Sequence, residues 1–370
     1  MGKHQKHAKL GLRNNNNFAP NEIAIVGTKC NEVSKLVQQV SEKLTNYKLA
    51  YFDASHSKDE RKQNVEEFVF NANGNITINS IGNLNKFNQR IQFSQYDFVF
   101  INGNHYQATK QILVLDNEKE ASVLKRLEQL NNIQFVIKLT EDAKYFDFLL
   151  EKNPQIKNLK CYKVSEIDKI SKHIENLIQE KIAAIQGLVL AGGKSTRMGT
   201  DKGTLYFYGK NQRDVAIELL EKNHLKTYLS VRKEQDITIE NKIVDTFIGL
   251  GPFGAICSAF QSNPNVAWLV LATDLPFVDD KVIQKLLKYR NPSKAATTIK
   301  GKGKQFPEPL ITLWEPKSYP LLLNYLAQGY SCPRKVLINS EVEIIEVEDD
   351  LIRNINTPEE FKKAKKEINE

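Results

Sequence analysis

Short apolar runs alternate along this chain with longer stretches of helical spacing. Residues 22–26, Glu-Ile-Ala-Ile-Val, form an apolar, β-branched run of the kind found in buried strands. Residues 32–46 show a helical period instead. Their shared apolar face consists of Val33, Leu36, Val37, Val40 and Leu44. A second strand is expected at 47–52, and this strand–helix–strand order is typical of a parallel sheet with crossover helices.

The same alternation continues through both halves of the chain. In the first half we expect further strands at 76–80, 97–102, 111–115 and 134–138, and helices at about 118–131 and 141–152. In the second half we expect strands near 186–191, 226–231, 242–244, 267–272, 295–299 and 309–314, and helices near 213–223, 252–261, 279–289 and 316–327. A closing strand near 342–347 precedes a terminal helix that begins at Pro358. The pattern predicts an α/β fold with helices on both faces of each sheet.

Length and pattern together indicate two domains. A chain of 370 residues is too long for one typical core. Residues 165–184 have the spacing of an amphipathic helix and precede the first strand of the second half. We therefore expect a flexible basic arm at 1–20, one three-layer α/β domain at 21–184 and a second at 185–370.

Composition narrows the class of protein. The net charge of +8 is spread along the chain, whereas a nucleic-acid site would need a clustered basic stripe. Four cysteines stand far apart without a C-x-x-C pair, which disfavours a disulfide scaffold or a zinc site and fits a reducing cytoplasm. No run of about eighteen apolar residues indicates a membrane span. We expect a cytoplasmic protein that binds neither nucleic acid nor membrane.

The strongest chemical signal is the run Leu-Val-Leu-Ala-Gly-Gly-Lys-Ser-Thr-Arg-Met-Gly-Thr-Asp-Lys-Gly at 188–203. An apolar strand leads into a loop with Gly192 and Gly193, whose amides can line a concave anion site. Arg197 and Lys202 add cations that neutralise phosphate charge. The spacing is neither the Walker G-x-x-x-x-G-K-[ST] nor G-x-G-x-x-G. The run predicts a phosphate-binding loop of another kind.

This L-A-G-G-x-S-x-R-M-G-x-D-K pattern resembles the signature loop of the MobA-like molybdenum cofactor guanylyltransferases, and the resemblance extends over residues 185–370. It implies a Rossmann-like nucleotidyltransferase fold with a mostly parallel sheet, GTP as substrate and Mg²⁺ as metal. The implied reaction transfers GMP from GTP to the terminal phosphate of molybdopterin and releases pyrophosphate. The loop positions to which it assigns nucleotide binding are Leu190, Ala191, Gly192, Gly193 and Lys202. It makes Arg197 and Lys202 catalytic.

A second signal is the apolar strand at 268–273, which delivers Asp274 at its carboxyl end. Open α/β sheets bind ligands at that edge, and Mg²⁺ takes one or two carboxylates together with phosphate oxygens. An aspartate here could instead cap the following helix. In the resembling family the aspartate of this D-x-P segment holds the magnesium. The resemblance therefore makes Asp274 a metal ligand, a catalytic residue and a nucleotide contact.

Other site positions rest on the same resemblance. Asp245 precedes the glycine-rich run 249–254 and occupies the place that the family pairs with the guanosine of GTP, although it could also be a helix cap. Ser230 stands on the strand from which the family reaches the nucleotide, often through an asparagine. Asn354 and Asn356 lie in an N-x-N-T-P-E-E run and are candidates to support the metal or the cofactor. The Thr-Pro-Glu part of that run is also a sound helix start.

The first half resembles MobB, a family of P-loop GTP-binding proteins from the same pathway. The points of contact are Ile23–Gly27, Tyr47–Asp53 and Tyr96–Gly103. The P-loop itself departs from the pattern, because Glu32 stands at its second glycine position and Val33 at its lysine position. A carboxylate and an isopropyl group cannot hold a triphosphate as an amide nest and an ammonium do. We expect a degenerate domain that has lost nucleotide hydrolysis.

Several functions remain open at this stage. The degenerate domain could hold the molybdopterin acceptor, contact a molybdoenzyme or cofactor-insertion protein, or provide a dimer surface. The catalytic half could be a cytidylyltransferase for the same pterin or a sugar-1-phosphate nucleotidyltransferase, and the whole chain could be a cofactor-delivery module without activity. Pterin cytidylyltransferases more often carry Ala-Ala-Gly where this chain has Ala191-Gly192-Gly193, which favours guanine. The residues that favour an enzyme over a delivery module are Gly193, Arg197, Lys202 and Asp274.

Overall fold

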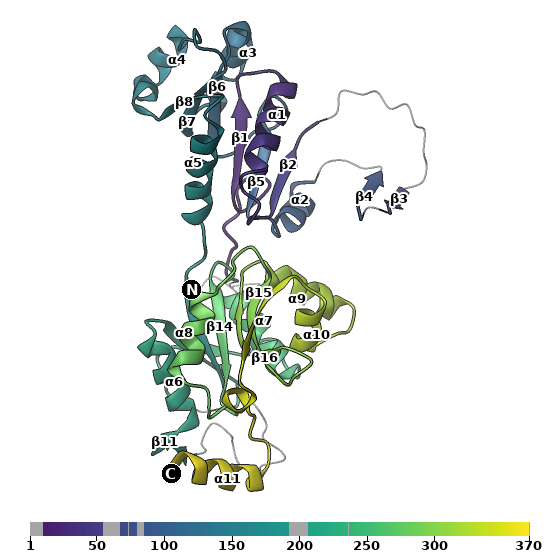
Figure 1. Cartoon of the computed structure of the whole chain (residues 1–370), viewed down its shortest axis with the longest axis vertical. Helices are drawn as coiled ribbons and strands as arrows, with labels where there is room; N and C mark the ends of the chain where they lie inside the picture. The colour runs from purple at the N-terminus through teal and green to yellow at the C-terminus, as the bar shows by residue number, and fades with distance from the viewer. Residues whose placement is uncertain are drawn as a thin grey trace, which may run out of the picture. The chain divides into compact units, whose positions relative to one another are not determined.

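The computed structural model describes residues 10–54, 67–72, 74–79, 85–191, 206–235 and 237–369 (Figure 1). The chain divides into two compact units. One unit is Asn15–Lys181, and the other combines the segment that ends at Asn14 with Ile182–Glu370. Both are α/β, which confirms the predicted class, and each is described below by itself.

The sheet of the N-terminal unit is parallel throughout its described strands, in the order β2-β5-β1-β6-β7-β8. The strands are β1 (Glu22–Val26), β2 (Leu49–Phe52), β5 (Phe98–Asn102), β6 (Gln111–Leu115), β7 (Ile133–Lys138) and β8 (Cys161–Lys163). Because β1 lies between β5 and β6, the sheet grows in both directions from its first strand. Such a point leaves a crevice at the carboxyl ends of the strands.

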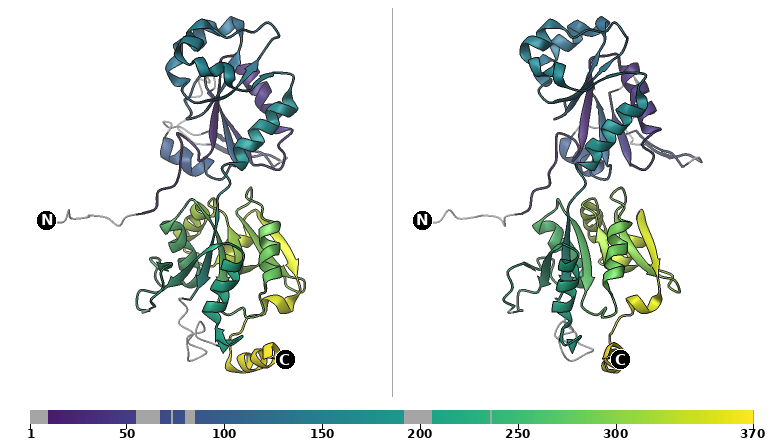
Figure 2. Two further views of the ribbon diagram at one scale, coloured as in Figure 1. Left: turned by 90° about the vertical axis from the view of Figure 1, so that its left-hand side faces the viewer. Right: turned by 60° about the vertical axis from the view of Figure 1, so that its left-hand side comes forward.

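Helices cover both faces of this sheet (Figure 2). The helices are α1 (Cys30–Ser41), α2 (Lys86–Phe93), α3 (Glu120–Lys125), α4 (Asp147–Lys152) and α5 (Ile167–Gln179), with 3₁₀ turns at Asn117–Lys119, Leu127–Gln129 and Pro154–Asn158. Helices α1 and α5 pack Val33 and Ile174 against one face, and α3 and α4 pack Val123 and Leu149 against the other. Alternate residues of each strand point into the two cores, as the period of a strand requires.

One predicted strand has a different partner. The sequence pattern placed a strand at 76–80 in the parallel sheet. In the structure β4 (Ile76–Asn79) pairs antiparallel with β3 (Glu67–Phe70) in a separate two-stranded sheet. Gly74, with φ of +84°, lies in the short connection, where its missing side chain permits the turn. Local pattern predicted the strand but not its pairing.

The sheet of the C-terminal unit is mostly parallel, in the order β13-β12-β9-β14-β16-β15-β17. Its strands are β9 (Ile185–Leu190), β12 (Lys226–Val231), β13 (Lys242–Val244), β14 (Ala267–Ala272), β15 (Ala296–Gly301), β16 (Glu308–Trp314) and β17 (Val342–Val347). Among these described strands, β16 runs against the others. A small hairpin of β10 (Tyr206–Phe207) and β11 (Lys210–Asn211) stands apart. The mostly parallel sheet confirms the prediction for this half.

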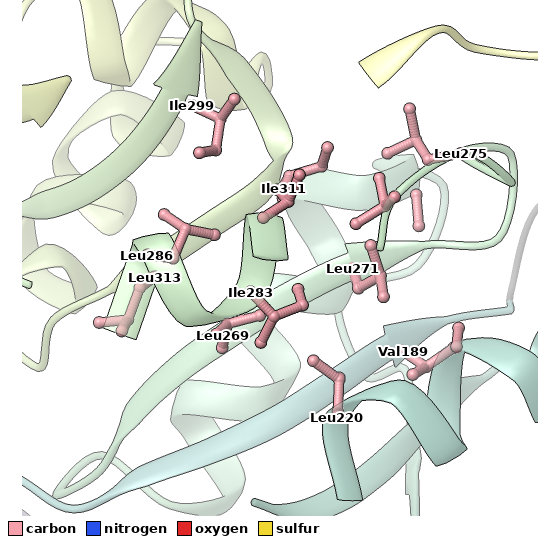
Figure 3. Close-up of a cluster of buried hydrophobic side chains, with 14 of the residues drawn as sticks. Val189, Leu220, Leu269, Leu271, Leu275, Ile283, Leu286, Ile299, Ile311 and Leu313 are labelled. Carbon is pink, nitrogen blue, oxygen red and sulfur yellow. The ribbon is translucent and has the colours of Figure 1, made fainter. Parts of the chain in front are cut away.

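Two apolar cores hold this sheet between its helices. The helices are α6 (Gln212–Lys222), α7 (Gly251–Ser262), α8 (Asp280–Lys288), α9 (Ser318–Ala327), α10 (Pro333–Ile338) and α11 (Pro358–Asn369), with a 3₁₀ turn at Asp349–Ile352. Leu220 of α6 and Ile283 of α8 pack on one face of the strands (Figure 3). Helices α7, α9 and α10 pack on the other face, where Trp268 and Trp314 are buried. None of the helices in the described ranges combines the length and apolar character needed to cross a bilayer.

Residues 10–20, predicted as part of a flexible arm, make fixed contacts in the structure. The carboxylate of Glu22 is fully buried and accepts backbone N–H bonds from Asn17, Phe18 and Ala19 at 3.0, 2.8 and 2.8 Å. Burial raises the pKa of Glu22, and these three amides oppose that rise by stabilising the charged form. Nearer the N-terminus, Leu12 accepts a hydrogen bond from Asn265 through its carbonyl at 2.8 Å. Residues 1–9 lie outside the described residues.

Candidate active site

The carboxyl ends of four parallel strands bring Ala191, Ser230, Asp245 and Asp274 to one edge of the C-terminal sheet. Strand β9 lies between β12 and β14, so this edge contains the topological switch point of the sheet, where the strand order reverses. Leu190 ends β9, and Ala191, only 3% exposed, donates its N–H to the carbonyl of Ser230 at 3.2 Å. Asp245 directly follows β13, and Asp274 is the second residue after β14. Pairing of the strands therefore places these side chains at the same edge.

The glycine-rich loop can be located only by its two ends. Gly192, Gly193, Arg197 and Lys202 lie outside the described residues. The loop leaves the sheet at Ala191 and returns at the β10–β11 hairpin, which leads directly into α6. The hydroxyl of Tyr208 in that hairpin donates to the carbonyl of Pro276 at 3.2 Å. Since Pro276 is two residues beyond Asp274, the hairpin is tied to the Asp274 segment.

Ser230, which is buried, and Asp245, which is half-buried, form a hydrogen-bonded pair across β12 and β13. The Ser230 Oγ donates to the Asp245 Oδ1 at 2.7 Å, and the Asp245 N–H donates to the carbonyl of Val231 at 2.8 Å. Burial raises the pKa of Asp245, whereas the Ser230 hydroxyl and the charge of Arg232 lower it. The carboxylate is thus fixed in orientation by its serine. Two oxygens on one carboxylate can accept bonds from two adjacent N–H donors of a base.

Arg232 and Gln235 join this edge without having been predicted as site residues. The Gln235 side chain accepts from the Arg232 N–H at 2.8 Å and donates to the carbonyl of Ala191 at 2.9 Å. It therefore holds the turn after β12 against the start of the glycine-rich loop. The Arg232 Nε is buried and has no hydrogen-bond partner within the described ranges. A cation directly after an apolar strand was the available signal for Arg232, as it was for Asp274.

A backbone hydrogen bond brings the asparagine run to Asp274. The N–H of Ile355 donates to the Asp274 carbonyl at 2.9 Å, so Asn354 and Asn356 flank the point of contact. The Asn354 Oδ1 is buried without a hydrogen-bond donor in the part of the chain that the structure describes. Asn356 also contributes to the start of α11, because its N–H donates to the Glu360 carboxylate at 2.7 Å. The asparagine run therefore both caps helix α11 and lies next to Asp274.

Glu308 brings a second carboxylate near Asp274. Strand β16 is antiparallel to β14 and pairs Ile311 with Leu271, so its first residue, Glu308, reaches the edge at which β14 ends. Burial raises the pKa of Glu308, and the charge of Asp274 raises it further, while Arg334 at 3.4 Å opposes the shift. The sequence analysis did not include Glu308. Its position follows from strand pairing, which the sequence alone does not give.

Several side chains at this edge carry oxygen atoms that can bind a cation. Asp274 supplies a carboxylate, and Asn354 and Asn356 supply amide oxygens, which together with phosphate oxygens form the donor set that Mg²⁺ prefers. No group of three or more His, Cys, Asp and Glu side chains within the described ranges is arranged to hold a metal ion by itself. A hard cation that also binds phosphate oxygens would fit Asp274 and the two asparagines.

Comparison with known proteins identifies the same half of the chain. Residues 187–343 match the MobA-like NTP transferase domain. A molybdenum cofactor biosynthesis bifunctional protein from Synechocystis sp. is 33% identical over 182 residues, and the alignment covers 48% of this chain and 52% of that protein. The chain thus spans about half the length of this relative. A probable molybdenum cofactor guanylyltransferase from Flavobacterium johnsoniae is 25% identical over 47% of this chain and 92% of its own.

A solved structure has a similar extent of overlap. Molybdopterin-guanine dinucleotide biosynthesis protein A from Archaeoglobus fulgidus is 25% identical, with a TM-score of 0.42, and covers 50% of this chain and 98% of its own. The domain match confirms the resemblance expected from the L-A-G-G loop and the aspartate that follows β14. The C-terminal unit of this chain therefore contains a nucleotidyltransferase domain of the MobA-like NTP transferase family.

Proposed function

We propose that the C-terminal unit transfers GMP from GTP to the terminal phosphate of molybdopterin, giving the guanine dinucleotide form of the cofactor and pyrophosphate. The observation that carries the proposal is the convergence of Ala191, Asp245 and Asp274 with the Asn354–Asn356 run at one sheet edge. The names of the Synechocystis and Flavobacterium relatives support the pathway and the nucleotide.

The chemistry needs positioning and charge neutralisation more than proton transfer. An oxygen of the acceptor phosphate attacks the α-phosphorus of GTP, the bond from that phosphorus to the bridging oxygen of the β-phosphate breaks, and pyrophosphate leaves. The acceptor phosphate is already ionised at neutral pH, so no general base is required. We assign Arg197 and Lys202 to the negative charge that develops on the phosphates. The amides of Gly192 and Gly193 would orient the triphosphate beside them.

Mg²⁺ fits the residues at the edge. Asp274 would hold it, with Asn354 and Asn356 as supporting amides, and the buried Asn354 Oδ1 provides an acceptor oxygen to which no donor within the described ranges is bonded. When bound, Mg²⁺ supplies positive charge next to the phosphate oxygens. The hydrogen bond from the Ile355 N–H to the Asp274 carbonyl does not involve the metal. It fixes the position of the Asp274 main chain. The protein thus positions the Asp274 main chain before any ligand binds.

The guanine preference rests on Asp245. A carboxylate can accept both N1–H and the exocyclic amino group of guanine, whereas cytosine offers only one such donor group on its pairing edge. Ser230 orients the carboxylate, and it takes the place where the family often has an asparagine. The nucleotide would lie with its base toward β13 and its phosphates toward the glycine-rich loop.

We infer that the N-terminal unit is a degenerate P-loop domain that serves the same pathway without hydrolysing nucleotide. Its former P-loop side chains are engaged within the unit: the Thr28 Oγ1 donates to Asp116 at 2.9 Å, and the Lys29 ammonium lies 2.6 Å from Glu118. Glu32 adds negative charge to the first turn of α1. The bifunctional name of the Synechocystis relative supports a second domain in the same biosynthesis.

Pyrophosphate release from the full chain tests the transfer. The four nucleoside triphosphates are each incubated with Mg²⁺ and either molybdopterin or a sugar 1-phosphate, and the pterin product is identified by mass spectrometry. We expect release with GTP and molybdopterin, with a guanine dinucleotide product. Preferred use of CTP would contradict the role of Asp245, and activity only with the sugar phosphate would contradict the acceptor. If the chain binds molybdopterin but releases no pyrophosphate with any combination of nucleotide and acceptor, it would be a delivery module instead.

A further inference from the structure

The carboxyl edge of the N-terminal sheet holds a group of reactive side chains that the proposed transfer does not use. Cys30 begins α1 after a three-residue connection from β1, Asp53 follows β2, and Asn104 and His105 follow β5. These three parallel strands are neighbours in the order β2-β5-β1. The topological switch point of the sheet lies at β1. The cluster therefore occupies the crevice in which such sheets bind ligands.

The geometry pairs a thiol with an imidazole. The Cys30 Sγ lies 3.3 Å from the His105 Nε2, and the same nitrogen lies 3.7 Å from the Asp53 Oδ1. Asn104 approaches the sulfur through its Nδ2 at 3.7 Å and donates from the same nitrogen to the Thr28 carbonyl at 2.9 Å. The thiol thus has a proton acceptor at hydrogen-bond distance and an amide donor beside it. Both are arrangements that stabilise a thiolate.

A carboxylate lies beside the pair. Burial raises the pKa of Asp53, but hydrogen bonds from Asn102 and Tyr51 outweigh burial, so that its pKa lies below the ordinary value. Its carboxylate oxygen Oδ1 lies 3.7 Å from the His105 Nε2, the nitrogen that takes the thiol proton in the step proposed below. Cys30 is also the first residue of the twelve-residue helix α1, whose N-cap residue makes no side-chain capping bond, and the helix dipole is positive at this end. The carboxylate of Glu32 in the same turn acts in the opposite direction.

We propose that Cys30 is a thiol–disulfide exchange site for small anionic disulfides. The Cys30 proton passes to the His105 Nε2, and the resulting thiolate attacks one sulfur of the disulfide. The new Cys30 S–S bond forms as the original S–S bond breaks. The second half of the reagent leaves as a thiolate and takes the proton from His105. The Cys30 sulfur is oxidised and the leaving sulfur is reduced, so the disulfide itself is the oxidant.

A cavity beside the pair explains the choice of an anionic reagent. It has a volume of about 300 Å³, and its wall includes both Asn104 and His105. Lys125 and Arg126 add positive charge to the same wall. Arg126 is held in place by donating to the Asn104 carbonyl at 2.7 Å and to the Ser122 hydroxyl at 2.8 Å. Carboxylates of a small thiol compound would find two cations in the cavity that His105, the partner of the Cys30 sulfur, also lines.

The other three cysteines provide internal comparisons. Cys257 is fully buried, and burial raises the pKa of its thiol to about 12. Cys161 and Cys332 are exposed. Cys332 stands at the N-cap of the short helix α10, so it resembles Cys30 in its place at a helix start. A difference in rate between Cys30 and Cys332 therefore reports on more than the helix terminus.

The test follows each cysteine of the full chain by mass spectrometry. Glutathione disulfide is the anionic probe, and 2-hydroxyethyl disulfide is the neutral one. At pH 7 we expect Cys30 to form mixed disulfides about tenfold faster than Cys161 or Cys332. The substitution His105→Gln should slow Cys30 about tenfold with both probes and move its rate profile to higher pH, with the Cys332 rate unchanged. Circular dichroism checks that each variant remains folded.

Two further variants separate the parts of the proposal. Lys125→Ala, at an exposed position, should slow exchange with glutathione disulfide and leave the neutral probe unaffected. Asp53→Asn should shift the pH profile of Cys30 in the same direction as His105→Gln but by less, because Asp53 acts through the imidazole. A Cys30 rate equal to that of Cys332, or one insensitive to His105→Gln, would overturn the reactive site. Equal effects of Lys125→Ala on both probes would overturn the anionic recognition.

Discussion

Asp274 combines the most functions of any single residue at the proposed transfer site. We expect Asp274→Asn to reduce GMP transfer about a hundredfold or more, because an amide removes the negative charge that would hold the metal while keeping the side-chain shape. Steady-state pyrophosphate release measures the effect. Asp350→Asn is the matched control: the same change in charge at an exposed position of the same unit should leave turnover within about twofold. Near-normal turnover of Asp274→Asn would contradict the assignment.

Asp245 links stability to pH. Burial raises its folded pKa above the unfolded value, so the folded state binds the proton more tightly and the free energy of unfolding falls as pH rises between those two values. At pH 7 the full cost of the buried charge is present. Asp245→Asn should therefore raise the free energy of unfolding of the C-terminal unit at pH 7 and reduce GTP affinity about tenfold.

Urea unfolding followed by tryptophan fluorescence measures this change in one unit. Both tryptophans of the chain, Trp268 and Trp314, are buried in the C-terminal unit, so the signal reports on that unit alone. The difference in free energy of unfolding between wild type and variant should narrow as pH falls, because the wild-type carboxyl takes up its proton in the folded state. A difference that is constant from pH 7 to pH 4 would exclude the carboxyl charge as its cause.

Among the elements, those with long apolar runs or clear helical spacing were predicted from sequence. The expected strands at 111–115, 226–231, 242–244 and 267–272 have the same bounds in the structure. Helix α10 was not predicted, because six residues are too few to establish a period. The pairing of strands could not be predicted from the sequence either. Strand β4 has a strand pattern, but its pairing with β3 depends on a turn at Gly74.

The proposed site shows the same division. Asp245 and Asp274 follow apolar strands, and that local signal together with the family pattern was enough to select them. Glu308 and Gln235 belong to the edge because of contacts between segments distant in sequence, through the antiparallel pairing of β16 and the bond to the Ala191 carbonyl. Arg232 carried a local signal that was not used. Sequence thus predicts what each strand delivers to the edge but not which strands become neighbours.

One buried ion pair joins three elements of the C-terminal unit. Arg290 follows α8, donates two bonds to the Glu315 carboxylate after β16 at 2.7 and 2.9 Å, and donates to the Ala183 carbonyl before β9 at 2.8 Å. Glu315 is 2% exposed at its side chain. We expect Arg290→Ala to lower the free energy of unfolding by about 3–5 kcal/mol, because it leaves a buried carboxylate without its counter-charge.

The same tryptophan-detected urea unfolding measures the loss. Lys222→Ala is the control, since it removes an ion pair with Asp280 in which the lysine side chain is 67% exposed. Such a pair contributes about 0.5 kcal/mol or less. Comparable losses in the two variants would show that Arg290 and Glu315 do not depend on burial for their effect.

The two units of the molecule share an architecture but differ at the edge where a nucleotide would bind. Both sheets grow in two directions from their first strand, β1 in one and β9 in the other. After β9 the chain continues with glycines and cations, whereas after β1 it continues with Thr28 and Lys29, which bond to acidic partners within the unit. One architecture thus carries a proposed triphosphate site in one unit and a thiol–imidazole pair in the other.

This difference predicts the number of nucleotides that one whole chain binds. Isothermal titration with Mg²⁺ and a non-hydrolysable GTP analogue should give one site per chain, and Lys202→Ala should weaken that site at least tenfold, because it removes a cation from the phosphates. Lys29→Ala is the matched control in the N-terminal unit and should change neither the stoichiometry nor the affinity, since the ammonium already pairs with Glu118. A second site that survives Lys202→Ala would restore nucleotide binding to the N-terminal unit. In that case Glu32 and Val33 would not have removed the P-loop function, and Cys30 would lie inside a nucleotide site.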